Sequence, residues 1–285
     1  MRILKGYQWK SRQLQCLFFT TILVWALFAT ILIFLDLPIS IALVDYNSPW
    51  ANAVASYGEV PGYLLISISL TLILREVWIH SRWISNPIFW ITISFNLIVI
   101  LLLLSDLVPE SFLNESGEMI LVLGYLIVQF LIIRLSKNLD YLSQQKSMNF
   151  ARITFYLALI TPLILVQSFK MLWGRIRFRD LATNYTNFTP WFQAQGITGN
   201  YSFPSGHTAM GWMLLPILIL LVDKNSWPPK IIGVVILTWG VIVALGRIVI
   251  GAHYASDVVF STGAAFISVI LLYNHYERNT SNIEL

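Results

Sequence analysis

The stretch LQCLFFTTILVWALFATILIFL, residues 14–35, contains 22 residues and no charged side chain. A helix rises about 1.5 Å per residue, so about 20 apolar residues cross the ~30 Å hydrocarbon core of a bilayer. The run is too long for a signal peptide and has no small-residue cleavage site. It therefore predicts a membrane-spanning helix.

The rest of the chain has the same character. Of 285 residues, 57% are hydrophobic and 11% are charged, against about 25% charged in a soluble domain. The mean hydropathy is +0.71. Seven further apolar segments lie at about 59–74, 87–105, 118–135, 153–173, 207–222, 231–249 and 254–273. We expect an all-α fold: a single integral-membrane domain over 1–285, with a polytopic bundle of about eight transmembrane helices.

The charged residues predict the topology of this bundle. With a cytoplasmic N-terminus, 13 of the 18 Lys and Arg lie in cytoplasmic segments, as the positive-inside rule requires. Both termini are then cytoplasmic, and acidic residues such as Asp36 and Glu59 fall on the outer side. The basic residues follow topology, so the net charge of +4 does not predict a nucleic-acid partner. The single cysteine, Cys16, excludes an internal disulfide.

Five basic residues break the rule together on the outer side: Lys170, Arg175, Arg177, Arg179 and Arg247. In KMLWGRIRF, residues 170–178, Arg177 follows Lys170 by seven positions. If the helix continues, two turns separate them and they share a face. These cations are either interfacial anchors that reach toward the headgroups or part of an anion site.

Two other polar groups lie on the same side. In GRIVIGAHYASD, residues 246–257, His253 and Asp257 are four positions apart and predict a pair on one helix face. An acceptor on one imidazole nitrogen leaves the other free as nucleophile or base. The alternative is that Asp257 only favours the positive end of a helix.

The stretch PSGH, residues 204–207, predicts the start of a helix. Gly206 allows close backbone approach to a ligand, and amides at a helix start can bind anions. The alternative is an ordinary helix cap followed by a solvated His207. Taken together, the cations fit a phosphate, and two histidines fit attack on it and protonation of the leaving oxygen.

The pattern Lys-x6-Arg, Pro-Ser-Gly-His and Arg-x5-His-x3-Asp resembles the type 2 phosphatidic acid phosphatase superfamily. Its membrane lipid phosphatase branch includes bacterial phosphatidylglycerophosphate and undecaprenyl pyrophosphate phosphatases. The resemblance implies a phosphohistidine on His253, oriented by Asp257, with His207 as general acid. It also implies a phosphate site with no metal and no cofactor, formed by Lys170, Arg177, Ser205, Gly206 and Arg247.

The chain departs from the family pattern at two positions. Phe178 stands where Pro usually follows the first-motif Arg, and Gly246 stands where Ser usually precedes the third-motif Arg. The family core commonly has six helices, which predicts a phosphatase core over 87–273 and added helices over 1–86. The oligomeric state is not predicted.

These observations favour a metal-independent membrane phosphatase that acts on a lipid phosphate or diphosphate at the outer face of the cell membrane. Undecaprenyl pyrophosphate, phosphatidylglycerophosphate and phosphatidic acid are candidate substrates. An aromatic-rich loop, about 178–203, is expected over the site at headgroup level. Two alternatives stay open: a lipid phosphotransferase with the same intermediate, and an anion transporter or binding protein. A metal centre of two histidines and one carboxylate is disfavoured because the surrounding Lys and Arg would repel a cation.

Overall fold

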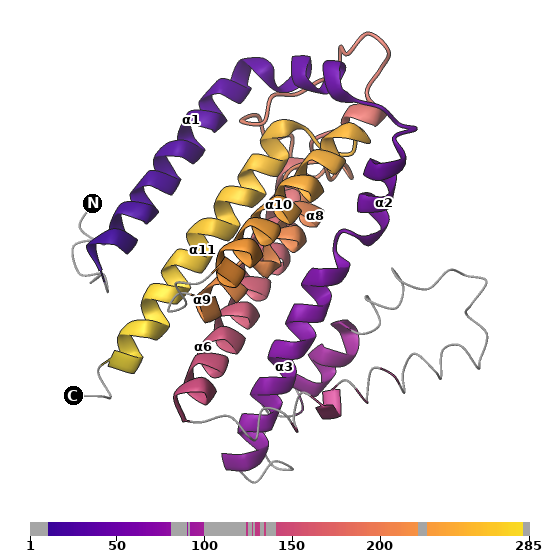
Figure 1. The fold of residues 1–285 in the computed structure, drawn as a ribbon. Helices are drawn as coiled ribbons and strands as arrows, with labels where there is room; N and C mark the ends of the chain where they lie inside the picture. Colours follow the sequence, from indigo (N-terminus) through magenta and orange to yellow (C-terminus); the bar gives the residue numbers. More distant parts are fainter. Residues whose placement is uncertain are drawn as a thin grey trace.

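The structure is a bundle of α-helices (Figure 1). It is a computed structural model of the chain and describes residues 11–80, 90, 92–99, 124, 127, 129–131, 134, 141–221 and 227–281. Every regular element within these residues is helical. The predicted all-α membrane bundle is therefore confirmed for the part of the chain that the structure describes.

The helices fall into three groups along the chain. The N-terminal group is α1 (Arg12–Leu43), α2 (Pro49–Tyr57) and α3 (Val60–His80). The middle group is α6 (Tyr141–Ala158), the π-helical η4 (Leu159–Val166), α7 (Gln167–Trp173) and the 3₁₀ turn η5 (Phe178–Asp180). The C-terminal group is α8 (Gly206–Gly211), the 3₁₀ turn η6 (Trp212–Leu214), α9 (Ile217–Leu221), α10 (Trp227–Val249) and α11 (Ala255–Ser281).

Five described stretches are long and apolar enough to cross a membrane: Arg12–Leu43, Pro49–Val77, Gln144–Asp180, Lys230–Val249 and Ala255–Tyr276. Gly206–Leu221 is a shorter apolar helical stretch. Together these match six of the eight predicted segments. The other two, 87–105 and 118–135, fall mainly on residues outside the described part.

The helix α1 continues past its predicted end at residue 35 and reaches Leu43. Asp36 is therefore inside a helix and only 1% exposed, so its predicted place in an outer loop was wrong. A charge in this position needs partners, because burying an unpaired carboxylate is costly. Its partners are at the candidate site described below.

The N-terminal helices pack directly on the C-terminal ones. α1 lies beside α11 along its length (Figure 1). Trp25 of α1 covers Gly263 of α11, where a Cβ atom would lie 2.5 Å from the indole ring.

α2 packs on α10. Gly246 faces Val54 there, and a Cβ atom would lie 3.1 Å from Val54 Cγ1. The departure from the family at Gly246 thus allows α2 to approach α10 closely.

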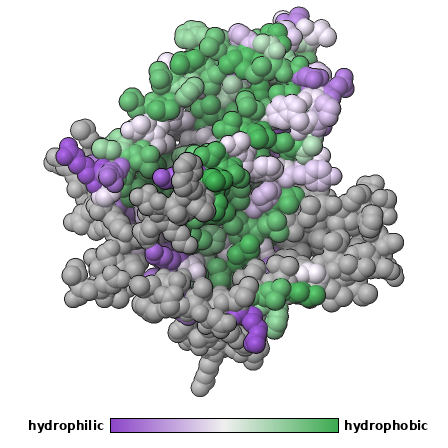
Figure 2. Space-filling model, viewed as in Figure 1, coloured by the Kyte–Doolittle hydropathy of each residue, from purple (hydrophilic) through white to green (hydrophobic). Residues whose placement is uncertain are grey.

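The outer face of α1 is apolar and uncovered by the described residues. Leu23 is 70% exposed and Phe34 is 76% exposed. Figure 2 shows hydrophobic side chains over much of the described surface. Apolar side chains are stable in such positions when lipid replaces water around them.

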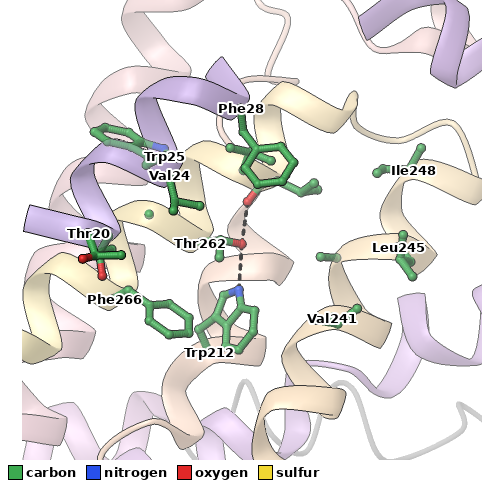
Figure 3. A pocket seen from close by; sticks show the side chains of 15 residues that line it. Thr20, Val24, Trp25, Phe28, Trp212, Val241, Leu245, Ile248, Thr262 and Phe266 are labelled. Carbon is green, nitrogen blue, oxygen red and sulfur yellow. Dashed lines mark hydrogen bonds between the residues drawn. The ribbon is translucent and has the colours of Figure 1, made fainter. Parts of the chain in front are cut away.

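An apolar cavity of about 420 Å³ lies between α1, α10 and α11 (Figure 3). Trp212 lines the cavity and donates from Nε1 to Thr262 Oγ1 at 2.8 Å. None of its lining side chains is charged. This cavity is therefore unsuited to a phosphate, and the polar site lies elsewhere.

Polar and charged side chains gather at one end of the bundle. α1 begins and α11 ends at the opposite end, while the connection 174–205 lies beside the C-terminal end of α1 (Figure 1). The loops that carry the three sequence motifs meet at this end, and backbone hydrogen bonds join them.

Candidate active site

The first motif does not form one continuous helix. Lys170 is in the last turn of α7, which ends at Trp173. Gly174 has φ +58, and a Cβ atom there would clash with the carbonyl oxygen of Gly196. A left-handed glycine ends helices in this way. Arg177 follows in extended backbone, so the predicted shared helix face of Lys170 and Arg177 was wrong.

Lys170 and Arg177 nevertheless lie in one electrostatic cluster with Arg247. Both arginines are close enough to Lys170 to interact with its charge. Arg247 is only 8% exposed, and the Nε atoms of Arg177 and Arg247 are buried with no hydrogen-bond partner. No hydrogen bond or ion pair joins these three side chains to another described residue. Glu59 is near enough to act on the charges of Lys170 and Arg247, but it forms no ion pair with either. Three like charges without a direct ion pair favour binding of an anion.

The second motif forms the start of α8. Ser205 is the N-cap residue, and its Oγ accepts from the backbone N–H of Thr208 at 3.3 Å. The Ser205 N–H donates to the Asp257 carbonyl at 3.2 Å, and Ser261 Oγ donates to the Ser205 carbonyl at 2.7 Å. Gly206 faces Lys170, whose Nζ would lie 3.4 Å from a Cβ atom. Ser205 and Gly206 are thus held between α11 and the cation cluster.

His253 lies in the tight turn between α10 and α11 and is 2% exposed. The turn depends on Gly251, with φ +64, and the His253 N–H donates to the Arg247 carbonyl at 3.1 Å. Nδ1 of His253 lies 2.6 Å from the carbonyl oxygen of Ser202 and 3.5 Å from Asp257 Oδ2. Since a carbonyl oxygen only accepts, Nδ1 carries the proton and Nε2 has a free lone pair.

Burial lowers the pKa of His253 to about 4, because the imidazolium would lose its hydration. The Asp257 hydrogen bond opposes this shift, and the charge of Arg247 adds to it. The ring is therefore neutral near pH 7, as a nitrogen nucleophile must be. The sequence predicted the His253–Asp257 pair but not the shorter bond to Ser202.

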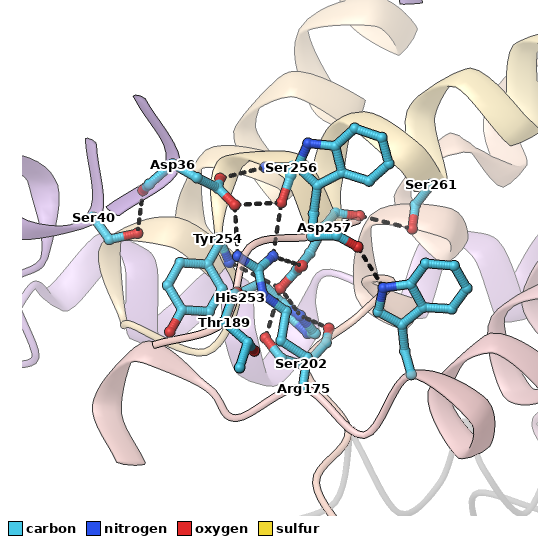
Figure 4. Close-up of polar contacts among 12 residues, drawn as sticks. Asp36, Ser40, Arg175, Thr189, Ser202, His253, Tyr254, Ser256, Asp257 and Ser261 are labelled. Atoms are coloured by element: carbon cyan, nitrogen blue, oxygen red, sulfur yellow. Dashed lines mark hydrogen bonds and ion pairs between the residues drawn. The ribbon is translucent and has the colours of Figure 1, made fainter. Parts of the chain in front are cut away.

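Asp257 is held mainly by Arg175, a residue that sequence reasoning placed on this side without a role (Figure 4). Arg175 is fully buried, and its Nη1 donates to Asp257 Oδ1 at 2.7 Å. Its Nη2 donates to Asp36 Oδ2 at 2.7 Å. Ser202 Oγ also donates to Asp257, at 2.6 Å to Oδ2. The guanidinium thus joins α1 to the start of α11.

The guanidinium of Arg175 makes two further hydrogen bonds and a contact with an aromatic ring. Its Nε donates to the Thr189 carbonyl at 2.9 Å, and Nη1 also donates to Ser256 Oγ at 2.7 Å. Its guanidinium carbon lies 3.9 Å from the centre of the Tyr254 ring. Four of its five N–H groups therefore have protein acceptors. Arg175 has little capacity left for a ligand.

His207 is partly exposed and contacts the N-terminal helices. Its Nδ1 lies 3.0 Å from Glu59 Oε1, just before α3. Its Nε2 lies 3.2 Å from the carbonyl oxygen of Ala55 on α2. Glu59 is a second site residue that sequence reasoning missed, since nothing local in the sequence links positions 59 and 207.

The connection 178–203 covers this end of the bundle, but its aromatic side chains do not all face outward. Phe178 is 7% exposed and stacks with Tyr185. Phe188 packs edge-on against Tyr254, and Trp191 donates from Nε1 to the Ala29 carbonyl of α1 at 3.1 Å. Phe192 is exposed. Phe188 lies beside the Arg175 guanidinium, whereas Tyr185 and Tyr201 are exposed like Phe192, so only part of the loop is in a position to face the headgroups.

A groove of about 330 Å³ opens beside the site. Glu59, Lys170, Gly206 and His207 line its polar part. Gln167 also lines it, and its other walls are mainly apolar and come from α3, residues 95–99, η4 and their neighbours, with the residues Tyr63, Ile66, Phe95, Ile98, Val99, Ala158, Pro162, Leu163 and Met210. Such a groove fits a molecule with a charged head and a hydrocarbon tail.

No three His, Cys, Asp or Glu side chains gather closely enough to hold a metal ion among the residues that the structure describes. The charges of Lys170 and Arg247 instead act on His253, and Lys170 lines the same groove as His207. This donor set fits an anion better than a cation.

Comparison with known proteins identifies the segment that carries these motifs. The family model of the PAP2 superfamily matches residues 151–281. The phosphatidylglycerophosphatase B of Haemophilus influenzae is 36% identical over 70 residues, which is 24% of this chain and 29% of that protein. No solved structure matches the chain significantly. The matched residues 151–281 make up just under half of the chain and contain all three motifs, in agreement with the predicted resemblance to this superfamily.

Proposed function

We propose that this protein is a membrane phosphatase that hydrolyses a lipid phosphate or diphosphate through a phosphohistidine on His253. The family of residues 151–281 supports phosphatase chemistry. The similarity to a phosphatidylglycerophosphatase supports a lipid substrate, although the alignment spans less than a third of that relative. Phosphatidylglycerophosphate, undecaprenyl pyrophosphate and phosphatidic acid are the candidates to test.

The observation that carries the proposal is that some polar groups of the site have hydrogen-bond partners in the protein and others do not. Lys170, Arg177 and Arg247 have no acceptor among the described residues, while Nδ1 of His253 is already bound and its Nε2 is not. A phosphate placed among the three cations would satisfy their donors. An anion transporter would explain the cations but not a neutral, oriented histidine beside them.

The chemistry follows from these roles. In the first step, Nε2 of His253 forms a bond to phosphorus as the bond to the leaving oxygen breaks, and that oxygen takes a proton from His207. In the second step, water attacks the phosphohistidine, His207 takes a proton from it, and the N–P bond breaks. The cations stabilise the charge on the phosphoryl oxygens in both steps. Ser205 and the Gly206 amide assist them.

The groove supports a lipid rather than a soluble substrate. Its polar end contains Lys170 and His207, and its apolar walls continue into the bundle. A phosphate head can lie at the cations while the hydrocarbon tail follows the apolar wall. The tail can then stay in apolar surroundings while the head reaches the cations, whereas a soluble sugar phosphate has no group that matches the apolar wall.

The test is a phosphate-release panel with purified protein and the three candidate lipids, with glucose 6-phosphate as the soluble comparison. We expect release from at least one lipid and little from the sugar phosphate. Addition of alcohol acceptors during turnover distinguishes hydrolysis from phosphotransfer, because a transferase makes a new phosphate ester. Lipid binding without release, in wild type and His253→Ala alike, would contradict the proposal.

The proposed reaction faces the outer side of the cell membrane, with both termini cytoplasmic. Thiol labelling in intact cells tests this in a Cys16→Ser background. Ala194 is exposed in the connection 178–203, and Gln13 is exposed at the start of α1. A cysteine at 194 should react with a membrane-impermeant reagent and one at 13 should not. The reverse pattern would place the reaction on the cytoplasmic side.

A further inference from the structure

Glu59 and Ala55 hold the two ring nitrogens of His207 from opposite sides. Glu59 Oε1 lies 3.0 Å from Nδ1, and the Ala55 carbonyl oxygen lies 3.2 Å from Nε2. Both contacts come from the end of α2 and the residue before α3, four positions apart. The other oxygen of Glu59 accepts from Tyr63 Oη at 3.0 Å, which fixes the carboxylate.

This arrangement favours one protonation state of His207. The Ala55 carbonyl oxygen can only accept, so Nε2 carries a hydrogen in this geometry. An ionised Glu59 also accepts, so Nδ1 carries a second one. A ring protonated on both nitrogens therefore has an acceptor for each hydrogen, and the carboxylate of Glu59 balances its charge. This is the opposite of His253, which is buried, neutral and bonded through one nitrogen.

We infer that Glu59 is a positioning residue that keeps His207 doubly protonated, so that it can give a proton to the leaving oxygen. The inference rests on the proposed function. When substrate binds, its leaving oxygen replaces the Ala55 carbonyl as the acceptor of the Nε2 proton. The Nε2–H bond then breaks as the O–H bond forms, while Nδ1–H stays on Glu59. Water returns a proton to Nε2 in the second step.

The inference gives the N-terminal helices a part in catalysis. Glu59 lies in the region 1–86 that the sequence suggested was an addition to the phosphatase core. It lines the groove with Lys170 and His207, so it is within the site itself. Glu59, between α2 and α3, therefore supports His207 as the general acid of the proposed reaction.

The experiment compares Glu59→Gln on two lipid-like phosphate monoesters with the same chain length, one with an alkyl and one with a nitrophenyl leaving group. The parameter is kcat/KM, because it reports the steps up to departure of the leaving group. An alkoxide needs a proton as it leaves, whereas a nitrophenolate does not. We expect Glu59→Gln to lower kcat/KM about 10- to 100-fold for the alkyl ester and less than about threefold for the nitrophenyl ester.

Three variants control the result. His207→Ala should show the same selectivity with a larger loss, and adding Glu59→Gln to it should cause no further loss. Tyr63→Phe removes the donor that fixes Glu59 and should show a smaller loss with the same selectivity, which keeps the test valid if Glu59→Gln does not fold. Asp45→Asn also removes one negative charge near this end but keeps the oxygen that accepts from the Asn47 N–H, and it should have no effect.

The outcomes separate the inference from the function on which it rests. Equal losses on both esters, in Glu59→Gln or in Tyr63→Phe, would mean that Glu59 only supports the fold, and the inference would be overturned while the phosphatase stands. If wild-type protein releases phosphate from neither ester nor from any lipid in the panel, the proposed function itself fails.

Discussion

Arg175 and Arg247 are both arginines buried at the same end of the bundle, but their surroundings differ. Arg175 donates to two carboxylates, a hydroxyl and a carbonyl, and every one of these bonds is 2.9 Å or shorter. Arg247 has a buried Nε without a partner and no ion pair with a described residue. Burial alone therefore does not distinguish the two arginines, whereas the protein acceptors around each guanidinium do.

The same contrast separates the two histidines. His253 has a committed Nδ1 and a free Nε2, and it is 2% exposed. His207 is partly exposed and has an acceptor at each nitrogen. The first arrangement favours a neutral nucleophile and the second favours an acid. The following predictions test these contrasts, beginning with the largest expected effect.

Removal of the proposed nucleophile should have the largest effect. His253→Ala should lower kcat about 10⁴-fold or more, because it removes the nitrogen that forms the covalent intermediate in the proposed reaction. Rapid acid-free quenching of wild-type protein with labelled substrate should give a phosphoenzyme that is stable to alkali and labile to acid. Peptide mapping should place the label at His253. A label on another residue would reject this role.

A matched pair of substitutions tests the two arginines. Arg175→Met leaves Asp36 and Asp257 buried without a counter-charge and should destabilise the protein by about 3–5 kcal/mol. Arg247→Met removes a cation that lacks a protein partner, so it should lower kcat/KM about 10²- to 10³-fold and leave the Tm in detergent unchanged or raised. The exposed Arg179→Met is the control and should change neither quantity much. A large drop in Tm for Arg247→Met would show that Arg247, like Arg175, stabilises the fold.

Asp257→Asn tests which group orients His253. Loss of a carboxylate that fixes the imidazole tautomer can cost about 10⁴-fold in kcat. Here the carbonyl oxygen of Ser202 lies 2.6 Å from Nδ1 of His253, while Oδ2 of Asp257 lies 3.5 Å from it. We therefore expect a smaller loss, about 10- to 100-fold. A loss near 10⁴-fold would show that Asp257, rather than the Ser202 carbonyl, controls the tautomer.

Much of the site was predictable from the sequence because its motif residues are close along the chain. The spacing of His253 and Asp257 predicted a pair on one helix face; their side chains do meet at 3.5 Å, but His253 lies in the turn before α11. Ser205 was predicted at the start of a helix, and it caps α8. The contacts of Asp36 with Arg175 and of Glu59 with His207 were not predictable, because 139 and 148 positions separate the partners. One available signal was missed: a lone Asp beside a long apolar run is costly in a membrane and usually has a partner.

The first motif shows a different limit. Seven-residue spacing suggested one helix face for Lys170 and Arg177, but Gly174 ends α7 between them. A glycine after the last apolar residue of a helix is a recognised stop signal. The two charges interact in the structure, but through the turn after α7 and not along one helix face. The predicted boundary between added helices and core remains a prediction, while α1 and α2 pack directly on α11 and α10.

The pH dependence gives a smaller effect. Burial holds the pKa of His253 at about 4, so the nucleophile is neutral above that pH and is lost to protonation as the pH falls through it. The acid side of the kcat/KM profile should therefore lack a step at the ordinary histidine value of about 6.5. Lys170→Met removes a charge that lowers this pKa, so its acid limb should move to higher pH. Comparison with wild type on one substrate cancels the ionisation of the phosphate. An unchanged acid limb would place Lys170 away from His253.

Chelation should have the smallest effect, because the unpaired cations take the place of a metal ion. Treatment with EDTA should change activity less than about twofold, and vanadate, which adopts the five-coordinate shape of the transition state, should inhibit. Vanadate at 100 times its Kd should also stabilise the folded protein by about 2.7 kcal/mol, seen as a rise in Tm.

Arg247→Met should lose most of this rise, whereas Arg179→Met should keep it. Because Asp36 and Asp257 already neutralise Arg175, the Asp36→Asn protein should keep it too, even with a lower starting Tm. Loss of the vanadate shift in Asp36→Asn but not in Arg247→Met would mean that Arg175 binds the anion and that the two arginines have been assigned the wrong way round.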